Sequence, residues 1–228
     1  MPLAVPQPCL CLVTDRTVTG DDALISHVAA AVAGGVDMVQ LREKDLPGAR
    51  LLELAETLME AIGGRALLVV NERVDVALAA AASGTQLGED ALPVNAAREI
   101  LGGNFLIGRS VHSVEGAVEA VEDGSDFLVV GTMFHTRSHP SAAPIGPGLI
   151  SRISERCTLP LIGIGGINAE NLGEVMSAGA EGVAVITSIL ASPDPEDAAR
   201  QLKRAMIEAG PGEPPLLHGE ARGDSRTG

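Results

Sequence analysis

The 228-residue sequence contains no tryptophan and no tyrosine, and aromatic residues make up only 1% of it. Recognition of nucleic-acid bases by stacking on aromatic rings is therefore not expected. The three cysteines, Cys9, Cys11 and Cys157, are too few and too scattered for a disulfide framework or a metal cluster. We expect Cys9 and Cys11 to be buried residues of the first strand.

Positive charge is also scarce. The sequence contains 16 Lys and Arg residues and 30 Asp and Glu residues, which gives a formal net charge of −14 and a pI near 4.7. This balance argues against nucleic acid or an anionic membrane as the main partner. The sequence has no apolar run of about 18 residues and no signal-peptide pattern, so we expect no membrane partner and a cytoplasmic location.

Short apolar runs alternate with helical patterns along the chain, and eight such strand–helix units are predicted. The strands are expected at 10–14, 38–41, 67–70, 85–87, 106–112 and 127–130 and in the runs beginning at Leu161 and Gly182. Strict alternation predicts a parallel sheet, and eight units close it into an α/β (β/α)₈ TIM barrel. An open doubly wound sheet is disfavoured, because Thr14-Asp15-Arg16 after the first run is not the glycine-rich turn that such sheets carry there.

We expect a single barrel domain over residues 1–209. The composition after residue 209 turns to Pro, Gly, Arg and Asp, which predicts a disordered C-terminal tail over 210–228. Within the barrel, Asp21 is expected to cap a helix that ends at Ala33, and Ser113 to cap the helix after the fifth strand. Another helix is expected over 74–82.

The last two strands end in small residues that suit a phosphate site. Glycines follow the run at Leu161, and Thr187-Ser188 follow the run at Gly182 at a predicted helix start. Backbone N–H groups at such turns attract anions, and phosphate sites of TIM barrels lie after strands seven and eight. The predicted phosphate-binding residues are Gly165, Gly166, Ile186, Thr187 and Ser188.

Polar residues gather where the other strands end, and these ends meet at one mouth of a barrel. They are Thr14, Gln40, Arg42, Lys44, Asn71, Glu72, Gln86, Ser110, His112 and Thr136. Two alternatives stay open: Gln40 could be an interior amide, and Arg42 with Lys44 could form a solvated edge. His112 suits proton transfer near neutral pH, although it could instead cap the helix that follows.

The chain resembles the thiamine phosphate synthase/TenI superfamily along nearly its whole ordered length. The strings that carry the resemblance are Val13-Thr14-Asp15, Gln40-Leu41-Arg42-Glu43-Lys44, Asn71-Glu72-Arg73-Val74-Asp75, Gln86-Leu87-Gly88, Gly108-Arg109-Ser110-Val111-His112-Ser113, Ile164-Gly165-Gly166-Ile167 and Val185-Ile186-Thr187-Ser188-Ile189. The resemblance implies a (β/α)₈ barrel of thiamine biosynthesis.

The superfamily has two enzymatic branches, and this sequence departs from the synthase pattern at three points. Glu72 stands where the synthases carry an aspartate that binds Mg²⁺. Asp90 comes one residue before the second such position, which Ala91 occupies. The string Thr136-Arg137-Ser138-His139 replaces Thr-x-Thr-Lys, whose lysine holds pyrophosphate. These departures favour the TenI branch, the thiazole tautomerases, which need no metal.

The resemblance therefore implies a tautomerase that aromatises a carboxythiazole phosphate without a cofactor, with His112 as general acid and base. Its small phosphorylated thiazole substrate would contact Gln40, Arg42, Lys44, Asn71, Ser110, Thr136 and Ser138. The alternative is a thiamine phosphate synthase that joins hydroxymethylpyrimidine diphosphate to thiazole phosphate, with Mg²⁺ on Glu72 and Asp90. A third reading is a non-catalytic protein that binds a thiamine precursor. A homodimer through barrel helices is also expected.

Overall fold

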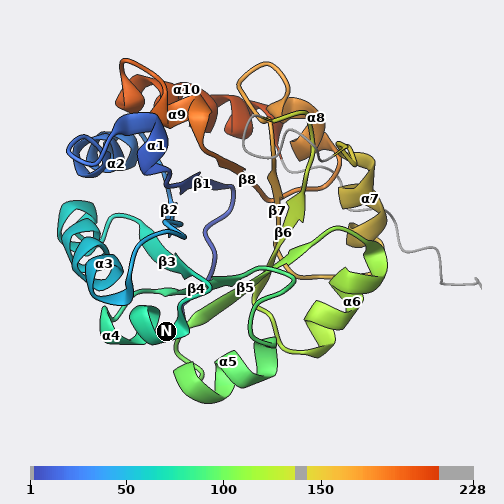
Figure 1. The fold of residues 1–228 in the computed structure, drawn as a ribbon. Coiled ribbons are helices and arrows are strands. Elements are labelled where there is room, and N and C mark those ends of the chain that lie inside the picture. Colours follow the sequence, from blue (N-terminus) through green and yellow to red (C-terminus); the bar gives the residue numbers. More distant parts are fainter. Residues whose placement is uncertain (1–2, 137–142, 211–228) are drawn as a thin grey trace, which may run out of the picture.

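Eight parallel strands form a closed barrel in the computed structural model, which describes residues 3–136 and 143–210 (Figure 1). Each strand pairs with its sequence neighbours, and β8 closes the ring on β1. The strands are β1 (Cys9–Val13), β2 (Met38–Leu41), β3 (Leu67–Asn71), β4 (Gly84–Leu87), β5 (Leu106–Val111), β6 (Phe127–Gly131), β7 (Leu161–Ile164) and β8 (Gly182–Val185). The predicted single-domain TIM barrel is confirmed.

Helices surround the barrel as an outer ring (Figure 1). They are α1 (Arg16–Thr19), α2 (Leu24–Ala33), α3 (Gly48–Ile62), α4 (Val74–Ala79), α5 (Val94–Leu101), α6 (Val114–Glu122), α7 (Gly148–Ser154), α8 (Leu172–Ser177), α9 (Thr187–Leu190) and α10 (Pro195–Ala209). Because helices cover the outside and side chains fill the inside, every strand is buried on both faces.

β1 shows how this burial explains the continuous apolar runs. Cys9, Cys11 and Val13 belong to the cluster inside the barrel. Leu10 and Leu12 belong to the larger cluster between the sheet and the helices. Successive side chains of a strand point to opposite faces, so both sets must be apolar. The prediction that the cysteines are buried is confirmed, and all three are free thiols.

Two local predictions were wrong. Asp21 does not cap the helix that ends at Ala33, because its carboxylate pairs with Arg16 at 2.8 Å and α2 begins without a side-chain cap. The helix expected over 74–82 ends at Ala79, and Ala81 adopts a positive φ of 50° that a helix does not allow. Ser113 does cap α6, since its hydroxyl accepts from the N–H of Gly116 at 3.0 Å.

The disordered tail and the homodimer stay predictions. Residues 211–228 lie outside the described residues. None of the helices in the described ranges is long and apolar enough to span a membrane.

Candidate functional site

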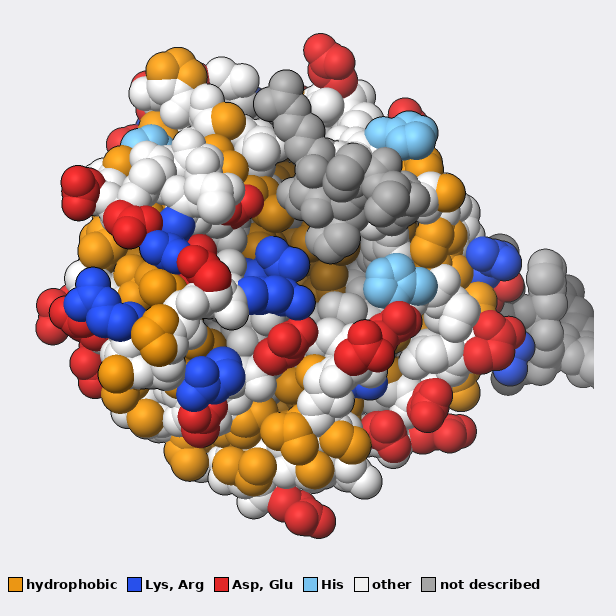
Figure 2. All heavy atoms as spheres, in the orientation of Figure 1, with side chains coloured by type: hydrophobic (Ala, Val, Ile, Leu, Met, Phe, Trp, Pro, Cys, Tyr) orange, Lys and Arg blue, Asp and Glu red, His pale blue; other side chains and the backbone are white. Residues whose placement is uncertain are grey.

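A cavity of about 770 Å³ opens at the carboxyl ends of the strands, where TIM barrels carry their active sites. It brings together twelve of the thirteen predicted site residues, namely His112, Gln40, Arg42, Lys44, Asn71, Ser110, Thr136, Gly165, Gly166, Ile186, Thr187 and Ser188. Ser138 lies outside the described residues. Figure 2 shows Lys and Arg side chains beside a central hollow on this face, with acidic and His side chains around them.

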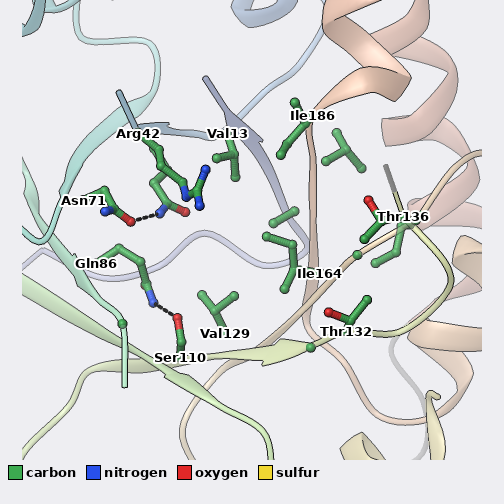
Figure 3. A pocket seen from close by; sticks show the side chains of 18 of the residues that line it. Val13, Arg42, Asn71, Gln86, Ser110, Val129, Thr132, Thr136, Ile164 and Ile186 are labelled. Atoms are coloured by element: carbon green, nitrogen blue, oxygen red, sulfur yellow. Dashed lines mark hydrogen bonds between the residues drawn. The ribbon is translucent and has the colours of Figure 1, made fainter. Parts of the chain in front are cut away.

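Four polar side chains from neighbouring strands form one side of the cavity (Figure 3). Nε2 of Gln40 on β2 donates to Oδ1 of Asn71 on β3 at 2.9 Å. Nε2 of Gln86 on β4 donates to the hydroxyl of Ser110 on β5 at 3.1 Å. Asn71 and Gln86 are register partners, which sets the two pairs side by side. Gln40 is therefore both a buried interior amide and a residue of the cavity wall, and we call these four residues the amide wall.

Two cations, Arg42 and Lys44, follow β2 and line the cavity. Arg42 is half-buried and points toward the middle of the cavity in Figure 3, and no carboxylate of the described ranges pairs with it. Nζ of Lys44 lies 3.5 Å from Oε1 of Glu72, and the Lys44 side chain is 56% exposed. The reading of a solvated edge therefore suits Lys44 better than Arg42, which is placed to meet an anion in the cavity.

Glu72 sits at the exit of β3 in a left-handed conformation, with φ of 59°. Such backbone is uncommon for a residue other than glycine and concentrates at functional sites. Gly88 makes room for the side chain, because a Cβ on Gly88 would lie 2.7 Å from Oε1 of Glu72. Gly88 therefore leaves room for the carboxylate of Glu72 in this conformation.

His112 follows β5 and is tied to the loop after β4. Its Nδ1 lies 2.8 Å from Oε1 of Glu89, and both side chains are about half exposed. Arg109 holds this loop in place, since its guanidinium donates to the carbonyl oxygens of Gly88 at 2.8 Å and Glu89 at 3.0 Å. The sequence predictions gave no site role to Glu89 or to Arg109, which lies within the predicted strand 106–112, because only the folded loop brings Glu89 to His112.

The exits of β7 and β8, where the sequence predicts a phosphate cup, lie side by side in the cavity wall. Gly165 and Gly166 have φ of 104° and 64°, which glycine adopts without strain. A Cβ on Gly166 would lie 2.4 Å from the carbonyl oxygen of His135, so the turn also needs glycine for space. The hydroxyl of Ser188 donates to the carbonyl oxygen of Ile167 at 2.6 Å and joins the two turns. The first N–H groups of α9 have no partner within the helix.

Carboxylates for a hard cation are present on the β3 and β4 side. Glu72, Glu89 and Asp90 all line the cavity, although within the described ranges no three His, Cys, Asp or Glu side chains are grouped closely enough to hold a metal by themselves. Mg²⁺ is usually held by one or two carboxylates together with substrate phosphates and water. The donor set on this side of the cavity therefore fits Mg²⁺.

The thiamine monophosphate synthase family (TMP-TENI) matches the chain over residues 10–189. The chain belongs to this family. It is 45% identical over 197 residues to a putative thiamine-phosphate synthase of Geobacter sulfurreducens. This match covers 85% of this chain and 92% of that protein. It is 42% identical over 193 residues to a thiamine-phosphate synthase of Roseiflexus castenholzii, covering 84% and 85% of the two chains. Among solved structures, it is similar to a thiamine phosphate pyrophosphorylase from Pyrococcus furiosus, with a TM-score of 0.81, 36% identity and coverage of 88% and 96%.

These relatives correct the predicted activity. The tautomerase assignment, with the chain as an isomerase of the TenI branch, was wrong, because curated proteins at 40–45% identity carry the name thiamine-phosphate synthase. The assignment relied on the loss of aligned metal ligands near Glu72 and Ala91. That loss does not empty the cavity of carboxylates, since Glu72, Glu89 and Asp90 still line it.

Proposed function

We propose that the protein is a thiamine phosphate synthase, a transferase that joins hydroxymethylpyrimidine diphosphate to thiazole phosphate and releases pyrophosphate. The observation that carries the proposal is its 40–45% identity to curated thiamine-phosphate synthases over most of both chains.

Two opposite sides of the cavity carry different groups, which supports a reaction of two substrates. The amide wall and Arg42 lie on one side, and Ile164, Ile186 and Thr136 lie on the opposite side (Figure 3). The phosphate cup on β7 and β8 suits the phosphate of the thiazole. The amide wall offers uncharged donors and acceptors for a heteroaromatic ring, and Arg42 stands beside it for the diphosphate. A cavity of about 770 Å³ is ample for two small ligands.

The reaction forms one bond and breaks another. The lone pair of the thiazole nitrogen forms a C–N bond to the methylene carbon of the pyrimidine, and the C–O bond to the diphosphate breaks. Pyrophosphate leaves with that electron pair, and no carbon loses a proton. The residues of this chain therefore act by holding the two rings in line and by balancing the negative charge of the departing group.

Mg²⁺ belongs to this proposal, with Glu72 and Asp90 as the residues that would hold it; bound there, it would neutralise charge on the diphosphate as it leaves. Arg42 and Lys44 supply further positive charge at the same mouth. With a divalent cation held by these carboxylates, an acidic protein could bind a polyanion, because the cation would offset the negative charge.

The proposal is tested by measuring pyrophosphate release with each component omitted in turn. We expect release only when both substrates and Mg²⁺ are present. Hydrolysis of the pyrimidine diphosphate that does not depend on thiazole phosphate would contradict the proposal. A Glu72→Gln, Asp90→Asn double variant should need more Mg²⁺ for half-maximal rate, whereas Glu53→Gln on the exposed surface of α3 should not.

A further inference from the structure

Gln86 is the polar residue of the amide wall whose presence is hardest to explain by stability. It is only 2% exposed, and its Oε1 is buried without a hydrogen-bond partner in the described structure. A buried acceptor without a partner destabilises the folded protein, and an apolar side chain of the same size would avoid this cost. The presence of an amide here therefore points to a role for the other polar atom of the side chain, Nε2.

The packing around Gln86 fixes the direction of its side chain. Gly108 is its register partner on β5. A Cβ on Gly108 would lie 2.1 Å from Oε1 of Gln86 and 2.3 Å from Cζ of Phe127, so the oxygen occupies space that only a glycine leaves. With Oε1 held there, Nε2 reaches the hydroxyl of Ser110 at 3.1 Å and makes a longer contact of 3.4 Å to the carbonyl oxygen of Leu87.

This hydrogen bond decides what Ser110 can do. A serine hydroxyl carries one proton and two lone pairs. Because Gln86 donates to Ser110, the interaction uses a lone pair and leaves the hydroxyl proton for another acceptor. Ser110 lines the cavity, and its hydroxyl lies on the wall opposite Ile164 and Ile186 (Figure 3). Ser110 is therefore set as a donor toward the cavity.

We propose that Gln86 is a positioning residue that makes Ser110 a hydrogen-bond donor to a ring nitrogen of the pyrimidine substrate. This role rests on the proposed function. A pyrimidine ring nitrogen accepts hydrogen bonds and cannot donate them, so a hydroxyl whose proton is turned toward it is complementary to that ring. The neighbouring pair offers an acceptor instead of a donor. Gln40 donates to Asn71 through Nε2 and keeps its own Oε1 as an acceptor for an amino group.

The test is a double-mutant cycle on Gln86→Met and Ser110→Ala, measured by calorimetric titration of hydroxymethylpyrimidine diphosphate without thiazole phosphate. Each single variant should bind this ligand about tenfold more weakly, the loss of one hydrogen bond. The double variant should bind no more weakly than Ser110→Ala, because Gln86 acts through Ser110. Affinity for thiazole phosphate should be unchanged in all three.

Thermal melting separates positioning from a structural role. Gln86→Met removes an unpaired buried oxygen, so its Tm should equal or exceed that of the wild type. Thr85→Val, on the same strand as Gln86, is the matched control, since it removes a buried hydrogen bond of 2.7 Å to the carbonyl oxygen of Val70 on β3. It should lower the Tm and leave affinity unchanged.

Several results would overturn the role of Gln86. They are wild-type affinity in Gln86→Met, losses that multiply in the double variant, or an equal loss of thiazole phosphate affinity. If Gln86→Met does not fold, wild-type affinity in Ser110→Ala alone overturns it. Failure of the wild type to bind the pyrimidine diphosphate would instead overturn the proposed function, and this role with it.

Discussion

Nδ1 of His112 lies 2.8 Å from Oε1 of Glu89, so the imidazole at the exit of β5 is tied to the loop that follows β4. Both side chains are about half exposed, and such pairs contribute at most about 1 kcal/mol to stability. The pair therefore matters for where the imidazole stands at the mouth rather than for holding the barrel together.

A His112→Asn variant should keep its free energy of unfolding within about 1 kcal/mol of the wild type. Its turnover in the synthase reaction should fall by less than about tenfold, because the proposed bond exchange removes no proton from carbon. Urea unfolding and steady-state pyrophosphate release measure the two quantities. A loss of roughly 10²–10⁴ in turnover would instead identify His112 as a general acid or base.

Arg42→Gln should weaken binding of the pyrimidine diphosphate by roughly 10- to 100-fold, since hydrogen bonds to a charged group are worth about 1.5–3 kcal/mol. Arg50→Gln is the control, because Arg50 lies on α3 and pairs there with Glu53 at 2.6 Å. Calorimetric titration of both variants checks the prediction. Equal affinities for Arg42→Gln and Arg50→Gln would show that Arg42 does not meet the diphosphate.

Gly166→Ala should lose stability and affinity for thiazole phosphate. The position has a positive φ, and the new Cβ would lie 2.4 Å from the His135 carbonyl oxygen, so the turn must shift. Gly173→Ala is the matched control, because Gly173 lies in α8 with open space around it. That change should stabilise the protein by about 0.5–1 kcal/mol. A Gly166→Ala variant with unchanged melting temperature and affinity would exclude the cup as described.

Folded protein should resist thiol reagents. Burial raises the pKa of the Cys11 thiol to about 12, and it raises the pKa of Cys9 and Cys157 as well. At pH 8 only about one Cys11 in 10⁴ would then be a thiolate, which is the reactive form. The three cysteines should be labelled only after denaturant is added. Rapid labelling of Cys9 or Cys11 in the native protein would mean that β1 opens without global unfolding.

The barrel could be predicted from sequence because burial on both faces leaves an unbroken apolar run in each strand, followed by polar residues at one shared mouth. The positions of Gln40, Arg42 and Asn71 follow from that rule alone. The pairing of His112 with Glu89 does not, because Arg109 must first fix the loop after β4.

The synthase and tautomerase branches could not be separated by aligned positions. The aligned sequence lacks an aspartate at Ala91, yet Glu72, Glu89 and Asp90 line the folded cavity. A carboxylate shifted by one residue from the aligned position can still bind the same cation, because Mg²⁺ takes most of its ligands from water and phosphate. Gln86 stood among the polar strand ends, but only its unpaired oxygen and its bond to Ser110 mark it out.

The most direct test of the synthase proposal is the mass of the organic product formed from hydroxymethylpyrimidine diphosphate, thiazole phosphate and Mg²⁺. We predict a single product that carries both rings and one phosphate, formed in equal amount to pyrophosphate. Recovery of both substrates unchanged, with pyrophosphate no higher than in the absence of the protein, would contradict the account.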